Sequence, residues 1–128
     1  MLITASFLAS INLGKILLVQ NEEGFWTLPG GERELGETER LALERKLLQE
    51  LAHANCIVGS FWDMVKSITP SSKQPVEVHV FLGSISGDIS PTAEIKASGW
   101  FSPSELGAYK ISPPTREILN RLIDQGRL

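Results

Sequence analysis

The sequence predicts an α/β protein, more specifically an α/β/α sandwich around a mixed β-sheet. Strand-like segments stand both before and after one long amphipathic helix, and a second helix closes the chain. Helices and sheets each have an apolar face to bury, so this order of elements favours helices packed on both sides of a sheet. The 128 residues are enough for a core without disulfides, and we expect one domain spanning residues 1–128.

The N-terminal segments predict a β-hairpin and a short third strand. Leu2–Ser10 and Lys15–Gln20 are rich in β-branched and large apolar residues, and Asn12-Leu13-Gly14 between them is a turn signal. Met1–Ile11 is apolar, but no Lys or Arg precedes it, and a first strand explains it as well as a signal peptide would. Phe25–Leu28 is a short extended piece that leads into a glycine-rich loop.

The segment from Gly30 to His53 predicts that glycine-rich loop followed by one helix, from about Thr38 to His53, with Thr38 as N-cap. At about 100° per residue, one broad side is apolar, and we expect it to face the core. This side consists of Leu41, Leu43, Leu47, Leu48, Leu51 and Ala54. The other side consists of Ala42, Arg45, Lys46, Gln49 and Glu50. Lys46, Gln49 and Glu50 stand together on it because positions i, i+3 and i+4 are helix neighbours.

The second half predicts three strands and a C-terminal helix. Ile57–Ile68 suggests a long strand with a bend or bulge, and a polar loop follows it. In Val76–Leu82, Glu77 and His79 alternate with apolar residues, so one face is buried and the other meets a cleft or solvent. The remaining predicted elements are a strand over Ala97–Phe101, a helical turn over Ser102–Leu106, and a helix from Pro113 or Pro114 to about Gln125, ended by Gly126 with Ile118, Leu119 and Leu122 inward.

One motif joins the loop to the helix. It reads Trp26-x-Leu28-Pro29-Gly30-Gly31, five residues, Glu37, seven residues, Arg45, and Glu50 at the fifth place after that Arg. This spacing resembles the Nudix box of the Nudix hydrolases, which would span Gly31–Ala52, and Trp100-Phe101-x-x-x-Glu105-Leu106 resembles the family's C-terminal stretch. The resemblance implies the α/β/α fold, and hydrolysis of a nucleoside diphosphate linked to another moiety, with Mg²⁺ or Mn²⁺ held by helix carboxylates.

The helix departs from that pattern at three positions. After the Arg, the family has Glu, an aliphatic residue, any residue, Glu, Glu, any residue and Gly, whereas this chain has Lys46, Gln49 and Ala52 in place of the first two Glu and the Gly. Lys46, Gln49 and Glu50 together carry no net charge, and a hard divalent cation needs several oxygen ligands. We therefore expect weak Mg²⁺ or Mn²⁺ binding and impaired catalysis.

The resemblance supplies the candidate catalytic residues Glu50, Glu37 and Arg45, and it implies that Arg45 braces Glu37 and the loop. A surface salt bridge is the alternative for Arg45. Glu50 is a metal ligand or a solvated carboxylate paired with Lys46, with neither favoured. Glu37 and Glu77 are the nearest candidates for further metal-ligating oxygens.

The loop glycines, His79 and the large aromatic residues each have a structural and a functional interpretation. A phosphate-binding loop at Gly30, Gly31 and Gly36 is favoured over simple turns, because Leu-Pro-Gly-Gly leads into a helix at family spacing. His79 is better explained as a satisfied histidine on a half-buried face than as a base or ligand. Three aromatic residues, Trp26, Trp62 and Tyr109, could stack on a nucleobase, but core packing is the commoner role of such side chains.

Composition restricts the partners and the compartment. The net charge of −3 gives no basic surface for polymeric DNA or RNA, so a small nucleotide derivative is the expected partner. The single cysteine, Cys56, excludes an internal disulfide, which favours the cytoplasm, and we expect it to be a small core residue. No apolar run reaches the ~20 residues of a membrane span. The sequence thus leaves two hypotheses: a Nudix hydrolase, or a catalytically inactive Nudix-fold module that binds nucleotides or proteins, with substrate and oligomeric state unspecified.

Overall fold

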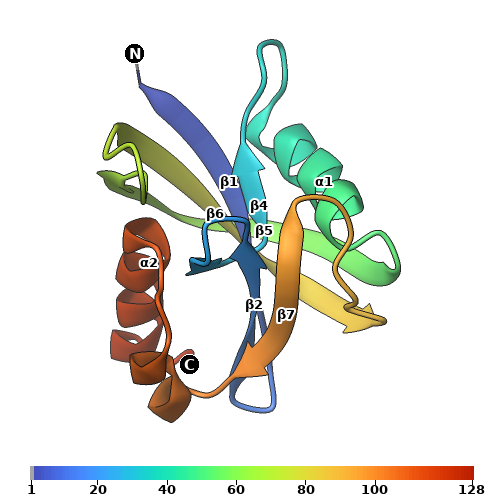
Figure 1. Ribbon diagram of the computed structural model, residues 1–128, viewed down its shortest axis with the longest axis vertical. Helices are drawn as coiled ribbons and strands as arrows, with labels where there is room; N and C mark the ends of the chain where they lie inside the picture. Colours follow the sequence, from blue (N-terminus) through green and yellow to red (C-terminus); the bar gives the residue numbers. More distant parts are fainter. Residues whose placement is uncertain (1) are drawn as a thin grey trace.

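The computed structural model describes residues 2–128, so Met1, the first residue of the apolar N-terminal segment, lies outside the described part. The elements are β1 (Ile3–Asn12), β2 (Lys15–Asn21), β3 (Trp26–Thr27), β4 (Gly30–Glu32), α1 (Glu39–Glu50), β5 (Ala54–Ile68), β6 (Pro75–Gly87), β7 (Ile95–Phe101), the 3₁₀ helix η1 (Pro103–Ala108) and α2 (Pro113–Asp124). The strands lie between α1 on one side and α2 on the other (Figure 1), which confirms the predicted α/β/α sandwich.

The sheet is mixed because one of its pairings is parallel. The strand order is β3-β2-β1-β6-β5, with β4 paired to β1 and β7 paired to β2. β1 and β6 run parallel from the pair Ile3 and Val76 to the pair Ser10 and Gly83, whereas the other pairings of these strands are antiparallel. The parallel pair requires a long crossover connection, which α1 and β5 supply.

The predicted N-terminal hairpin is present but short. β1 and β2 pair at Ile11 with Ile16 and at Asn12 with Lys15. Leu13 and Gly14, with φ values of 52° and 75°, form the turn, as expected for a tight hairpin between right-twisted strands. Beyond it the strands separate, β1 to join β4 and β6, and β2 to join β3 and β7.

Each helix closes its own part of the core. On the α2 side, Ile118, Leu119 and Leu122 are fully buried, as predicted, and pack in one cluster with Ala5, Ala9, Val76, Val78 and Val80 of β1 and β6. On the α1 side, Leu43, Leu47 and Leu51 pack in a second cluster with Leu8, Leu17 and Phe81. Alternation along β1 directs Ala9 to one cluster and Leu8 to the other, so both faces of the sheet are buried.

The predicted helix is confirmed, but its end and its buried face differ. The Thr38 Oγ1 accepts a hydrogen bond from Leu41 N at 3.2 Å, as an N-cap does. The helix ends at Glu50, three residues before His53, because Leu51 has left the helical region with φ −136° and ψ 56°.

The broad apolar side predicted for this helix was wrong at three of its positions, since Leu41 and Leu48 are exposed and Ala54 lies beyond the helix as the first residue of β5. Leu41 and Leu48 are 55% and 71% exposed, whereas Ala42, assigned to the polar side, is fully buried. The helix contacts the sheet through a narrower stripe in which the small Ala42 allows close approach, and leucines at the margins of the stripe stay in solvent.

The elements after α1 follow the prediction with longer strands. β5 begins at Ala54 and carries register shifts against β6 between Val58 and Asp63, which confirms the expected bulge. β6 continues to Gly87. A capping box formed by Ser102 and Glu105 begins η1, and Gly126 follows α2 with a φ of 71°.

The buried stripe of α1 predicts unequal effects of two neighbouring leucines. Leu47→Ala should lower the free energy of unfolding by about 2–5 kcal/mol, because Leu47 is 3% exposed and truncation leaves a cavity. Leu48→Ala, on the same helix but 71% exposed, should cost less than about 0.5 kcal/mol. Urea unfolding of the two variants measures the difference, and equal losses would contradict the assigned face.

Candidate functional site

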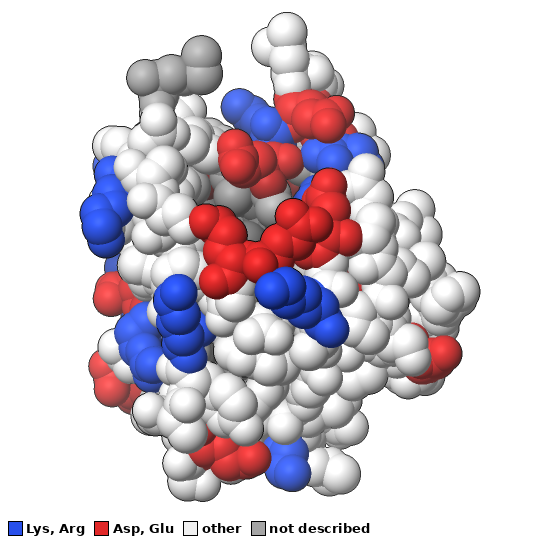
Figure 2. All heavy atoms as spheres, in the orientation of Figure 1, with Lys and Arg blue, Asp and Glu red and all other residues white. Residues whose placement is uncertain are grey.

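A cleft of about 720 Å³ lies between the glycine loop (residues 29–36), α1 and the strands β1 and β6. Its apolar lining includes Ile3, Ala5 and Phe7 of β1 and Val76 and Val78 of β6. Its charged lining consists of Glu22, Glu23, Glu32, Arg33, Glu34, Arg45, Lys46, Glu50 and Glu94. Figure 2 shows acidic side chains gathered around a hollow on this face of the molecule, with basic side chains beside them.

Close packing explains two of the loop glycines. A Cβ on Gly30, whose φ is 135°, would lie 2.0 Å from the carbonyl oxygen of Ser6 on β1. A Cβ on Gly31 would lie 2.6 Å from Lys46 Cε. Gly36 lies in the turn before α1, outside the cleft lining. The loop is therefore shaped by its contacts with β1 and Lys46, and its role in phosphate binding stays a prediction.

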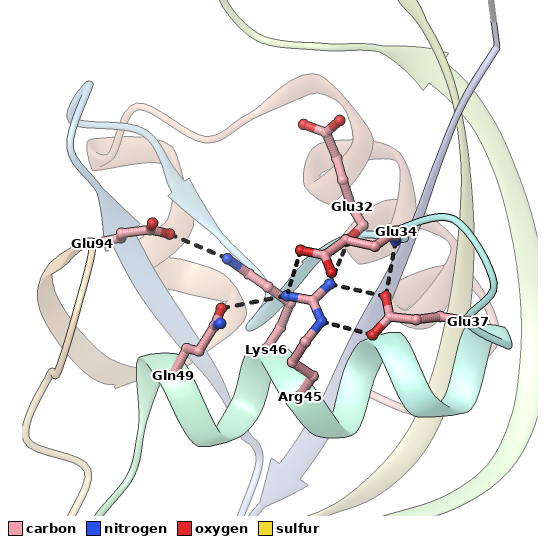
Figure 3. A network of polar contacts seen from close by, with 7 residues as sticks. All are labelled: Glu32, Glu34, Glu37, Arg45, Lys46, Gln49 and Glu94. Carbon is pink, nitrogen blue, oxygen red and sulfur yellow. Dashed lines mark hydrogen bonds and ion pairs between the residues drawn. The ribbon is translucent and has the colours of Figure 1, made fainter.

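Arg45 holds Glu37 and the loop together (Figure 3). Its Nε donates to Glu37 Oε2 at 2.7 Å and its Nη2 donates to Glu37 Oε1 at 3.0 Å. The same Nη2 donates to the Glu32 carbonyl oxygen at 3.1 Å, and Glu34 N donates to Glu37 Oε1 at 2.8 Å. The hydrogen bonds from Arg45 and Glu34 lower the pKa of Glu37. This is the bracing geometry that the resemblance implied, and it engages both oxygens of Glu37.

Glu50 is buried at the base of the glycine loop. It is 5% exposed, and its Oε1 accepts a hydrogen bond from Gly30 N at 2.9 Å. Burial raises the pKa of Glu50 to about 7, although the Gly30 amide and the charge of Lys46 act in the opposite direction. The alternative of a solvated Glu50 paired with Lys46 is therefore wrong, because the carboxylate is enclosed and makes its hydrogen bond to the loop.

Lys46 and Gln49, which replace two of the family's glutamates, make different contacts (Figure 3). Lys46 Nζ lies 3.2 Å from Glu94 Oε2, and only 15% of its side chain is exposed. Gln49 is exposed, and its Oε1 accepts a bond from Arg45 Nη1 at 3.5 Å, which is a weak contact. The three side chains that the helix pattern placed together thus have different surroundings. Lys46 reaches Glu94 at the cleft, Gln49 lies in solvent, and Glu50 is buried at the base of the glycine loop.

Glu77 does not join the site. Val76 and Val78 line the cleft, and side chains alternate along a strand, so Glu77 lies on the opposite face of β6. There its Oε1 is 3.9 Å from His79 Nε2, and the His79 ring lies 6.0 Å from the ring of Phe61. The expectation that Glu77 faces the cleft is wrong, because the buried face of β6 is itself the cleft-lining face.

The large aromatic residues and Cys56 are packing residues in this structure. The ring of Trp26 makes edge contacts with Phe101 at 4.9 Å and Tyr109 at 5.7 Å, and Trp62 packs against the α2-side cluster. None of these four aromatic residues belongs to the cleft lining. Cys56 is half-buried against the α1-side cluster, and burial raises the pKa of its thiol.

Sequence reasoning missed the acidic rim of the cleft. Glu32 and Glu34 stand two residues apart in the loop, a signal that was visible in the sequence. Glu94 reaches the cleft from the turn before β7, 44 residues beyond Glu50, and only the fold brings it to Lys46.

The donor set on α1 does not fit the metal site that the resemblance implies. Lys46 places an ammonium and Gln49 an exposed amide where the family has carboxylates, and one oxygen of Glu50 is already bonded to Gly30. Within residues 2–128 there is no group of three or more His, Cys, Asp or Glu side chains arranged to hold a metal ion. Of the three helix positions at which the resemblance implies carboxylates, only position 50 carries one.

The mixed sheet between two helices, with a cleft formed by a glycine loop and the following helix, defines an α/β/α sandwich of the Nudix type. Residues 3–122 match the NUDIX domain family, and the chain belongs to this family.

Particular relatives support the assignment. A proposed 8-oxo-dGTP diphosphatase of Bacillus subtilis (strain 168) is 30% identical over 110 residues, covering 81% of this chain and 68% of the relative. The solution structure of the E. coli ORF135 protein is similar with a TM-score of 0.73 and 27% identity, covering 94% of this chain and 90% of that one. The MutT NUDIX hydrolase from Burkholderia pseudomallei shares the fold with a TM-score of 0.80 and 23% identity, covering 94% and 97%. In the part of the chain that the structure describes, no helix is long and apolar enough to cross a membrane.

The buried Glu50 predicts a specific dependence of stability on pH. Its folded pKa of about 7 lies above the value of 4.5 for an exposed Glu, so the folded state keeps the proton while the unfolded state loses it between these values. Stability should therefore fall by ~3 kcal/mol as pH rises through this window, relative to Glu50→Gln, which remains neutral and can still accept from Gly30 N.

Urea unfolding of wild type and Glu50→Gln at pH 4.5, 6 and 8 measures this difference, and the comparison cancels the other titrating groups. A difference between the two proteins that stays constant across the three pH values would contradict the raised pKa.

Proposed function

We propose that the cleft binds a small nucleotide derivative, a nucleoside diphosphate linked to another moiety, and that its hydrolysis is impaired in the natural chain. The observation that carries the proposal is the contact of 3.2 Å between Lys46 and Glu94, at a helix position where the family has a metal-binding glutamate. The ammonium of Lys46 repels a divalent metal ion, so it lowers the affinity of this helix face for Mg²⁺ or Mn²⁺. Weak Mg²⁺ or Mn²⁺ binding is part of the proposal.

The size and lining of the cleft support a ligand of this type. Its volume of about 720 Å³ is within the range of pockets for small molecules and cofactors. The valines and Phe7 offer an apolar surface, and the glycine loop with Lys46 offers polar groups beside it, which suits a ligand with a planar and a charged part. Ser112 also lines the cleft, and its buried Oγ has no hydrogen-bond partner in the described chain. The name of the Bacillus subtilis relative points to a nucleotide as well.

The proposed roles of the site residues follow from their contacts. Glu50 is the one helix carboxylate retained at a family metal position, and Glu37 is a weaker candidate because Arg45 occupies both its oxygens. Arg45 is proposed to hold the loop in shape, since it bonds to Glu37 and to the backbone of Glu32. Gly30 and Gly31 are proposed to let the phosphates approach the backbone, and Gly36 to complete the turn that begins the helix.

A catalytically inactive binding module is the second candidate. The Lys46 contact with Glu94 and the exposed amide of Gln49 favour it, because both groups replace carboxylates without any nearby substitute on α1. The two candidates predict the same ligand-binding cleft and differ only in turnover.

The double substitution Lys46→Glu with Gln49→Glu should distinguish them. It restores three carboxylates on α1, and Arg45 can pair with the new carboxylate at position 49 as it now contacts Gln49. We expect little or no turnover by wild type with Mn²⁺, and detectable turnover by the double variant on at least one substrate. Released phosphate and nucleoside monophosphate would be measured across nucleoside triphosphates, sugar nucleotides and dinucleoside polyphosphates.

A matched control adds Glu50→Gln to the double variant, which should remove the restored turnover. Strong turnover by the wild-type protein that Glu50→Gln abolishes would overturn impairment. Silence from wild type and double variant alike would favour the binding module.

A further inference from the structure

The strand β5 forms one edge of the sheet, because it ends the strand order and pairs with β6 alone among the described strands. An edge strand presents unpaired N–H and C=O groups to which a strand of another chain can bond, and proteins shield such edges with charged residues, proline or covering elements. Residues 54–62, the first part of β5, contain no charged residue and no proline. This composition is typical of a segment that pairs with copies of itself.

Apolar groups are exposed along the same part of β5. Ile57 and Phe61 are 57% and 52% exposed. A groove of about 330 Å³ lies between α1 and this part of the strand, and Leu48, Ala54 and Val58 are among its lining residues. A second copy of the chain would cover these apolar groups while its own β5 bonds to the edge. Antiparallel pairing about a two-fold axis uses the same surface of both copies and closes at a dimer.

Arg40, in the first turn of α1, bonds to the backbone of this strand. Its Nη1 donates to the Val58 carbonyl oxygen at 2.9 Å, and its Nη2 donates to the Gly59 carbonyl oxygen at 2.5 Å. Both carbonyls lie at the bulge, where the pairing of β5 with β6 shifts register between Val58 and Phe61. The guanidinium carbon also lies 5.2 Å from the centre of the Phe81 ring, a cation–π contact that helps to hold the side chain in place.

The second part of β5 is shielded by α2 and by its own charges. Arg121 of α2 forms an ion pair with Asp63 at 3.0 Å, and its Nη1 lies 3.4 Å from the Met64 carbonyl oxygen. Lys66 is exposed on the same part of the strand. In the described chain, Arg40 is the one charged side chain that donates to the backbone of residues 54–62. The uncharged part of the edge therefore depends on Arg40 for its shielding.

We infer that Arg40 prevents β5 from pairing with a second copy of this chain, because its guanidinium occupies two carbonyl oxygens at which another β5 would attach. An approaching strand has to displace two charge-assisted hydrogen bonds before it forms its own. Without Arg40, these acceptors lie open beside the exposed side chains of Ile57 and Phe61. The partner is β5 of the second copy, antiparallel to the first. The inference is independent of the proposed function, since none of these residues lines the cleft.

Sedimentation equilibrium of Arg40→Met in the full chain, from micromolar to millimolar concentrations, tests this. Methionine can still cover Phe81, but its side chain has no N–H donor. Wild type should stay monomeric, and Arg40→Met should dimerise with a dissociation constant at least about tenfold below the highest concentration used. Arg40→Gln, whose side chain is too short to reach both carbonyls, should dimerise as well and replaces the methionine variant if urea unfolding shows that one to be unfolded.

The matched control Arg127→Met removes the same charge at an exposed position, and it should stay monomeric. Adding Ile57→Lys to Arg40→Met places a charge on the edge and should restore the monomer. Hydrogen exchange should show the amides of residues 54–61 of Arg40→Met better protected at high than at low protein concentration. A wild-type dimer paired through β5, monomeric Arg40→Met and Arg40→Gln, or a dimer that Ile57→Lys leaves intact would each overturn the inference.

Discussion

The close approach of the glycine loop to β1 is the constraint on which the site depends. At Gly30 the loop backbone is so near Ser6 that any side chain would overlap its carbonyl oxygen. This approach allows β4 to pair with β1 and brings the Gly30 amide within 2.9 Å of Glu50 on α1. Loop, strand and helix are thereby fixed against one another, and the cleft is what remains between them.

The buried Glu50 shows how one position can serve structure and site together. A carboxylate with a single backbone partner is costly to bury in its charged form, which explains the raised pKa. Replacing it with an apolar residue would leave the Gly30 amide without its acceptor. Glu50 is therefore explained by the loop it holds, independently of any metal, and its retention beside Lys46 is not by itself evidence of catalysis.

Lys46 and Glu94 show why the charge of a helix face is an incomplete guide to a site. The charged side chains of α1 sum to zero, but they do not all meet a ligand. Glu50 is buried and Arg45 is ion-paired with Glu37. The rim of the cleft adds further carboxylates from other segments. What an approaching ligand meets is therefore set by which charges are already paired. In this chain, Lys46 is itself paired with Glu94 at the rim of the cleft.

The sequence alone determined the fold class, the order of the elements, the N-cap at Thr38 and the loop–helix motif, because these depend on local periodicity, turn residues and spacing. It also indicated the pairing of Arg45 with Glu37 through the motif. Only the tertiary structure decided that Leu48 is exposed and Glu77 faces away from the cleft, since packing selects which part of an apolar face is used. It alone placed Glu94 on Lys46, because a contact between residues 48 positions apart is set by the path of the chain and not by any local pattern.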